Sequence, residues 1–207
     1  MDKQKAALIV DTLSGIFQDK PALKFNSPYK LLVAVILSAQ CTDERVNKTT
    51  EVLFKNYNTP EKMLTLNANE LEKYIFSCGF YHTKAAHILS ASADIINKFG
   101  GKVPDNLEDL RSLAGVGRKT ANVVYSVAFH GNAIAVDTHV FRVSNRIGLA
   151  SANDVLKTEM QLMDIIDEND WSRSHHYLIY LGRSFCSAKS PKCGDCPINA
   201  LCEKKIK

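Results

Sequence analysis

The chain has 207 residues, of which 45% are hydrophobic and 23% charged, and its formal net charge is +4. This balance is typical of a globular protein and excludes a disordered chain. The longest apolar run, 31–37, is far shorter than the ~20 residues of a membrane span. Residues 181–207 hold six Lys or Arg and two acidic residues, so this tail carries the whole excess charge. It favours an acidic partner such as a phosphate backbone, although a solvated terminus would look the same.

Helical periodicity dominates the N-terminal half. Apolar residues at 9, 13, 16 and 17 predict a first helix. The Val- and Ile-rich run 31–37 has the composition of a strand, but no second run of similar quality could pair with it, so we expect a core helix. Thr59-Pro60 has the cap and proline of a helix start. Two further helices are expected at about 71–78 and 88–99, because glycines follow each of them.

The C-terminal half continues in the same way. Asn106 precedes apolar residues at 107, 110 and 113, which predict a helix, and valines at 123, 124 and 127 predict another. A short extended segment, 133–136, leads into a helix that begins after Asp137-Thr138 and reaches about residue 147. The expected fold class is all-α.

The segment 113–120, Leu-Ala-Gly-Val-Gly-Arg-Lys-Thr, separates two of these helices. Glycines at 115 and 117 allow a tight turn whose backbone N–H groups can approach an anion. A nucleotide-binding P-loop is excluded, because Arg118 separates the second glycine from Lys119 and position 112 is serine. A plain turn between helices remains the alternative, since two glycines with this spacing are a weak signal.

Lys119 lies in the expected first turn of the following helix. There its ammonium would face the positive end of the helix dipole with Arg118 beside it, and we expect both to favour the neutral amine. A neutral lysine is a nucleophile that forms Schiff bases. Asp137 has two interpretations: it caps the helix that follows it, or its carboxylate stabilises positive charge at a sugar carbon.

Four of the six cysteines fall close together as C-x6-C-x2-C-x5-C: Cys186, Cys193, Cys196 and Cys202. This spacing is typical of a closed, structural metal site, whereas buried reduced cysteines alone would not explain it. Zinc sites of four cysteines usually have two C-x2-C pairs and this chain has one, which favours iron and sulfur without settling the metal. The other two cysteines and the pair His175-His176 are expected to pack in the structure.

Three motifs in this order resemble endonuclease III, a family of helix-hairpin-helix DNA glycosylases with an iron–sulfur cluster. They are the hairpin L-A-G-V-G-R-K-T-A-N-V-V, the segment V-D-T-H-V-F-R-V and the cysteine tail, and the early stretch L-L-V-A-V-I-L-S-A-Q-C-T-D matches as well. The resemblance implies two helical domains with the active-site cleft between them. One is a central barrel at 21–132, with the helix-hairpin-helix at about 107–129. The other combines 1–20 with 133–207 and holds a 4Fe–4S cluster at 186–202.

The resemblance also implies the chemistry. Lys119 would attack C1′ of a flipped, oxidised pyrimidine nucleotide, form a Schiff base and break the strand by β-elimination, and Asp137 would be the catalytic carboxylate. Gln40 would fill the hole left by the base. Phe80 stands where the family commonly has the leucine of G-L-Y. The implied DNA contacts are Gln40, Phe80, Gly115, Val116, Gly117, Arg118, Thr120, His139, Lys189 and Lys192.

The expected partner is duplex DNA with an oxidised pyrimidine or an abasic site, with a monovalent cation at the hairpin. We expect a cytoplasmic monomer with no membrane role, because no targeting segment is visible. Two rivals stay open. A mismatch-specific monofunctional glycosylase of the same fold would lack the lysine, and a non-catalytic DNA-binding module would leave Asp137 without a role.

Overall fold

The computed structural model describes residues 1–206, and in that range the chain forms helices and no strand, which confirms the all-α class. None of these helices is long and apolar enough to cross a membrane. The chain divides into two compact units. We call Pro21–Phe129 the central unit, and Met1–Lys20 together with the chain from His130 onwards the terminal unit. The second junction thus follows Phe129, where residue 132 was expected.

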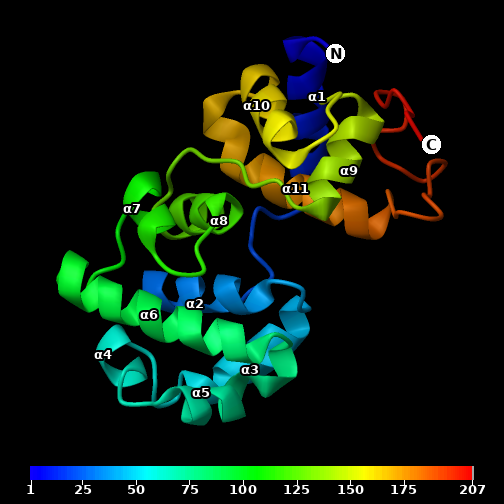
Figure 1. Cartoon of the computed structure of the whole chain (residues 1–207). Helices are drawn as coiled ribbons and strands as arrows, with labels where there is room; N and C mark the ends of the chain where they lie inside the picture. The colour runs from blue at the N-terminus through cyan, green and yellow to red at the C-terminus, as the bar shows by residue number, and fades with distance from the viewer. Residues whose placement is uncertain (207) are drawn as a thin grey trace. The chain divides into compact units, whose positions relative to one another are not determined.

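The central unit is built around α2 (Pro28–Ser38), which packs against α3, α6 and α8 (Figure 1). All residues from Leu31 to Leu37 are at most 5% exposed. A helix that is buried all round needs no polar face, which explains why this run lacks helical periodicity. The other elements of the unit are α3 (Asp43–Leu53), α4 (Pro60–Met63), α5 (Ala68–Ile75), a 3-10 turn η1 (Phe76–Cys78), α6 (Tyr81–Phe99), α7 (Leu107–Ser112) and α8 (Arg118–Ala128).

The terminal unit packs its first and last helices together. Its elements are α1 (Lys3–Ser14), α9 (Thr138–Ile147), α10 (Val155–Ile165), a 3-10 turn η2 (Glu168–Asp170) and α11 (Trp171–Ser184), and the cysteine tail follows. α11 packs against both α1 and α9. Their shared core consists of aliphatic side chains that include Ile9, Leu13, Val143 and Leu181. The tail therefore begins directly beyond a helix that the core holds in place.

Side-chain caps set the helix starts that the sequence predicts at Thr59, Asn106 and Asp137. Thr59 accepts the amide of Lys62 at the start of α4, and Asn106 accepts that of Asp109 at the start of α7. The expected extent of the first helix is wrong, because α1 ends at Ser14 before Gly15. Glycine is disfavoured inside a helix, because fixing its backbone costs more conformational entropy than fixing that of other residues.

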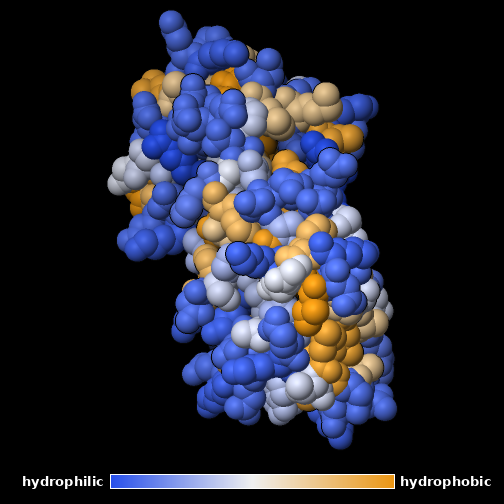
Figure 2. Space-filling model, turned by 90° about the vertical axis from the view of Figure 1, so that its left-hand side faces the viewer, coloured by the Kyte–Doolittle hydropathy of each residue, from blue (hydrophilic) through white to orange (hydrophobic). Residues whose placement is uncertain are grey.

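Hydrophilic side chains cover most of the face shown in Figure 2, and apolar ones gather in limited areas between them. Single exposed apolar residues are normal on a protein surface. The large apolar side chain with the greatest exposure among those described is Phe80, at 67%. Phe76, four residues earlier, is almost as exposed, at 66%.

Candidate active site and cluster loop

The hairpin between α7 and α8 depends on its first glycine. Gly115 has φ +75°, and a Cβ built there would lie 2.8 Å from the side chain of His87 on α6. The amide of Val116 donates to the carbonyl of Leu113 at 3.1 Å and its side chain is buried. Val116 therefore helps to hold the turn together.

The second glycine opens the helix start. Gly117 is the N-cap of α8, and no side chain caps that end. The first amides of a helix make no hydrogen bonds within the helix, so the start of α8 directs N–H groups outward, where an anion can approach. The geometry of this helix start suits an anion.

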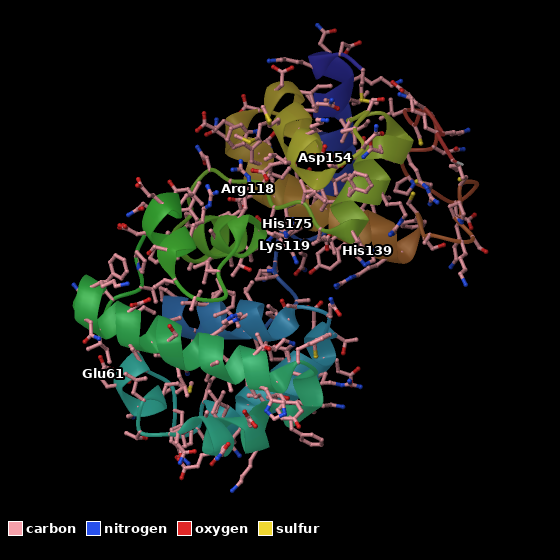
Figure 3. All side chains as sticks on the ribbon, in the orientation of Figure 1. Glu61, Arg118, Lys119, His139, Asp154 and His175 are labelled. Atoms are coloured by element: carbon pink, nitrogen blue, oxygen red, sulfur yellow. The ribbon has the colours of Figure 1, made fainter. Side chains whose placement is uncertain are left out.

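Three predicted site residues occupy the first turn of α8, as expected: Arg118, Lys119 and Thr120. Lys119 is exposed, and Figure 3 labels it with Arg118 at the start of this helix. The first turn contains no acidic residue. Ala121 and Val124 of the same helix are fully buried, so the core of the central unit holds the helix that carries this exposed amine.

Asp137 belongs to the terminal unit and caps α9. Its Oδ1 accepts the amide of Val140 at 2.7 Å. The extended segment before it, 133–136, is buried. His175 on α11 donates from Nδ1 to the carbonyl of Ala135 at 2.6 Å, since a carbonyl can only accept. Both interpretations of Asp137 remain compatible, because the cap engages one carboxylate oxygen and the half-buried side chain has two.

His139 lies on α9 (Figure 3). It contacts a basic residue one turn later. Arg142 Nη2 lies 3.1 Å from His139 Nδ1. A guanidinium can only donate, so Nδ1 accepts and the proton of the neutral ring is on Nε2. The same guanidinium donates to the carbonyls of Gly182 and Cys186. Arg142 thus ties the segment after Asp137 to the start of the cysteine tail.

A second arginine of α9 holds the cluster loop, which we define as residues 186–202. Arg146 Nη1 donates to the carbonyl of Ser187 at 2.7 Å and lies 3.8 Å from Cys186 Sγ. Its Nη2 donates to the carbonyl of Ala188 at 2.8 Å. Our sequence reasoning missed both arginines, although positions 139, 142 and 146 form a basic stripe at helical spacing.

The four tail cysteines line one small cavity of about 20 Å³. Burial raises the pKa of Cys196 and of Cys202, and neighbouring thiols raise it further. A metal must therefore displace protons when it binds, as thiolate ligands generally require. The amide of Lys204 donates to Cys202 Sγ at 3.3 Å, a contact of the kind that tunes metal-bound thiolates.

This donor set fits an iron–sulfur cluster. The four thiols line one cavity, and thiolates are the ligands that hold such clusters. Within residues 1–206, no group of three or more His, Cys, Asp or Glu is arranged around a single metal ion.

Gln40 and Phe80 both lie in the central unit, where two helical segments end. Gln40 follows α2 with φ +52°, and Phe80 precedes α6 with φ +48°. Both side chains are exposed. Lys189 and Lys192 lie in the terminal unit, both exposed on the cluster loop. The predicted site residues thus form two groups, one in each unit.

Two family models match the chain. The family model described as HhH-GPD superfamily base excision DNA repair protein matches residues 33–168. A second, the iron-sulfur binding domain of endonuclease III, matches residues 186–202.

Relatives match over most of their length. Endonuclease III of Haemophilus influenzae is 50% identical over 185 residues, which cover 89% of this chain and 88% of the relative. The Bacillus subtilis protein is 50% identical over 183 residues, covering 88% and 84%. The solved structure of a trapped endonuclease III–DNA covalent intermediate, 46% identical, aligns with a TM-score of 0.93 over 99% of this chain and 97% of that one. The chain therefore belongs to the endonuclease III family of HhH-GPD base excision repair proteins and is a DNA glycosylase and AP lyase with a 4Fe–4S cluster.

Proposed function

We propose that this enzyme removes oxidised pyrimidines from duplex DNA and cleaves the resulting abasic strand through a Schiff base on Lys119. The observation that carries the proposal is the position of this lysine, exposed in the uncapped first turn of a helix whose other face is buried. A nucleophile must be both accessible and held still, and this position provides both.

The reaction then proceeds in two stages. Lys119 Nζ bonds to C1′ while the bond from C1′ to the base breaks, and the base leaves with the electron pair and takes up a proton. The sugar ring then opens: the C1′–O4′ bond breaks as the nitrogen, having lost a proton, forms the iminium ion, and O4′ leaves with the electron pair and takes up a proton. Loss of a C2′ proton then expels the 3′ phosphate by β-elimination. A 46% identical relative was captured as a covalent intermediate with DNA, which supports a covalent path.

Asp137 has an electrostatic task in this scheme. A carboxylate near C1′ stabilises the positive charge that develops as the base departs, and it can assist proton transfer. Its bond to the amide of Val140 fixes the rotamer of the side chain. The cap and the catalytic role are then two uses of one carboxylate.

The remaining site residues would bind the DNA. The first turn of α8, with Gly115, Gly117, Arg118 and Thr120, takes a phosphate directly or through a monovalent cation, while Val116 supports the turn. His139 donates from Nε2 to the backbone, and Lys189 and Lys192 add charge from the cluster loop. When bound, the cluster ties this loop together. Gln40 and Phe80 fill the hole in the stack left by the extruded nucleotide.

A monomer is sufficient for base removal and strand cleavage, because one chain supplies every residue named. Its substrate places it in the compartment that holds the chromosome. Oxidised pyrimidines are the proposed lesions, and contacts to phosphate contribute no base specificity.

Borohydride trapping tests the proposal directly. The substrate is duplex DNA with a single thymine glycol, and the proteins are wild type, Lys119→Ala and the control Lys30→Ala, which removes another first-turn lysine of the central unit. Wild type and Lys30→Ala should form a reduced covalent adduct and Lys119→Ala should not. An adduct with Lys119→Ala would move the nucleophile elsewhere. Base release without any adduct in wild type would favour a monofunctional glycosylase.

A further inference from the structure

A buried lysine lies beneath the two residues proposed to enter the DNA stack. Lys84 is on α6 and is 4% exposed. Its ammonium donates to the carbonyls of Leu37 at 2.8 Å, Ala39 at 2.8 Å and Cys78 at 2.7 Å. These bonds use all three hydrogens of the group. A charge this well satisfied can stay ionised in the interior.

The three carbonyls come from two separate segments. Leu37 and Ala39 belong to the end of α2, and Gln40 follows them directly. Cys78 is the last residue of η1, and Phe80 is two positions later. The one ammonium therefore joins the backbone just before each of the two stack-entering residues. Both segments lie in the central unit, so this joint does not depend on the other unit.

Both residues have a backbone conformation that needs support. Gln40 has φ +52° and Phe80 has φ +48°, a region where side chains with a Cβ carry strain. Both side chains are exposed, so packing of the side chains does not hold them. Strain of this kind persists only where the surroundings fix the backbone, and the Lys84 bonds supply such a constraint.

A purely structural role would be served at lower cost by an apolar side chain. Burial lowers the pKa of Lys84, and this lowering is opposed by the nearby thiols of Cys41 and Cys78. Desolvating an ammonium is expensive, and methionine fills a similar volume without that cost. Methionine, however, could not hold carbonyls from two segments at one point.

We propose that Lys84 is a positioning residue that sets the spacing of Gln40 and Phe80 for insertion into the DNA stack at the lesion. The inference rests on the proposed function, in which these two side chains replace the extruded nucleotide. Without the ammonium, three carbonyls lose their donor and the two segments move independently. Insertion of Gln40 and Phe80 into the DNA stack then becomes slower. The reaction of Lys119 with a sugar that is already accessible keeps its rate.

The experiment compares two substrates. One is duplex DNA with a thymine glycol opposite 2-aminopurine, whose fluorescence reports the disturbed stack. The other is single-stranded DNA with an abasic site, which needs no insertion. The proteins are wild type, Lys84→Met, Lys84→Gln and the control Lys98→Met, an exposed lysine of the same helix. Thermal unfolding and cluster absorption are recorded for each protein. Lys84→Gln keeps two donors and serves if Lys84→Met does not fold.

Lys84→Met should slow the fluorescence change and base release on the duplex by about tenfold to a hundredfold, because a displacement of ~1 Å can cost that much. Strand cleavage on the single strand should stay within about twofold. Lys84→Gln should fall between wild type and Lys84→Met. Equal losses on both substrates would make Lys84 a purely structural residue and overturn the proposal, as would an unchanged duplex rate.

A double-mutant cycle adds a test that a general loss of stability cannot imitate. In a protein that already carries Gln40→Ala and Phe80→Ala, Lys84→Met should cause no further loss on the duplex. A full additional loss would contradict action through these two residues. If wild type cleaves neither substrate, the proposed function itself fails and this inference falls with it, whereas active wild type with an equally active Lys84→Met overturns the inference alone.

Discussion

The carboxylate of Asp137 has a structural and a chemical use that one substitution can separate. Asparagine caps a helix as well as aspartate does, so Asp137→Asn should keep the bond to Val140 and the stability within about 0.5 kcal/mol. Base release should slow by about a hundredfold or more, because the charge is lost. Single-turnover excision and thermal unfolding measure the two effects.

The matched control is Asp154→Asn. Asp154 is the N-cap of α10 in the same unit, and its Oδ1 accepts the amide of Lys157 at 2.8 Å. This substitution should leave excision and stability unchanged. Excision by Asp137→Asn at the wild-type rate would limit Asp137 to its role as a cap.

Alanine at the two hairpin glycines should lower the stability of the fold to different degrees. Gly115→Ala places a methyl 2.8 Å from His87 at φ +75°, and should cost about 1–3 kcal/mol in stability. Gly117→Ala meets no heavy atom within 4 Å and has φ −79°, so it causes neither clash nor strain. Stability should fall by only about 0.5–1 kcal/mol, because alanine is a poorer N-cap than glycine. Thermal unfolding distinguishes them.

DNA binding provides the second measurement for this pair. A methyl on Gly117 lies where the proposed phosphate approaches α8, so Gly117→Ala should weaken binding to an abasic-site duplex while the fold is intact. Fluorescence anisotropy gives the affinity. Binding as tight as wild type would show that the phosphate does not approach this position.

Residues with a local signal were predictable from the sequence, and those with distant partners were not. The hairpin glycines and the cysteines follow spacings set by a single turn or loop. Lys84 instead bonds to a carbonyl 47 positions away. A weak signal was present, because Lys84 falls in the apolar stripe of α6 with Ala85, Ile88 and Ile95. An apolar stripe does not predict which backbone carbonyl groups a lysine within it will bond to.

At the scale of elements, α9 connects the region of Asp137 to the cluster loop. Arg146 holds the first part of that loop through the carbonyls of Ser187 and Ala188. Arg146→Met should loosen the loop, so the visible absorption of the cluster should bleach about tenfold faster, or more, under an iron chelator. Arg111→Met, an exposed arginine of α7, is the control. Equal bleaching rates would show that the cysteines hold the loop without Arg146.

The cluster loop also presents charge to the DNA in our proposal. Lys192→Ala should lower the slope of log affinity against log salt concentration by about one, and weaken binding equally for different sequences. Lys157→Ala, an exposed lysine of α10 in the same unit, controls for net charge. An unchanged slope for Lys192→Ala would remove this lysine from the interface.

Helix starts were easier to predict than helix ends. A start depends on a cap and the next three residues, as Thr59 and Asn106 illustrate. The end of α1 was misplaced because apolar residues beyond Gly15 continue the helical spacing, and Phe17 there packs against Tyr180 of α11, far along the chain. Periodicity reports which side is buried, but it does not report whether the backbone is still helical.

At the scale of the whole molecule, the stability should depend on pH through His176. Burial and then the charge of His175 lower its pKa from 6.5 to about 3, while Asp19 opposes this. In the unfolded chain the His176 ring therefore takes up a proton near pH 6.5, whereas in the folded chain it does so only near pH 3. The resulting stability is complete above about pH 6.5 and falls by up to about 1.4 kcal/mol per pH unit below it.

The variant His176→Phe removes this titration while it keeps an apolar ring of similar size. Between about pH 7 and about pH 5, wild type should lose about 2 kcal/mol more stability than the variant, because that interval includes about 1.5 pH units below the unfolded value. Urea unfolding at both pH values measures it, with cluster absorption followed in parallel. His130→Asn, an exposed histidine of the same unit whose positive φ asparagine tolerates, should behave as wild type. If His176→Phe and wild type lose the same stability, the acid sensitivity of the fold comes from other groups.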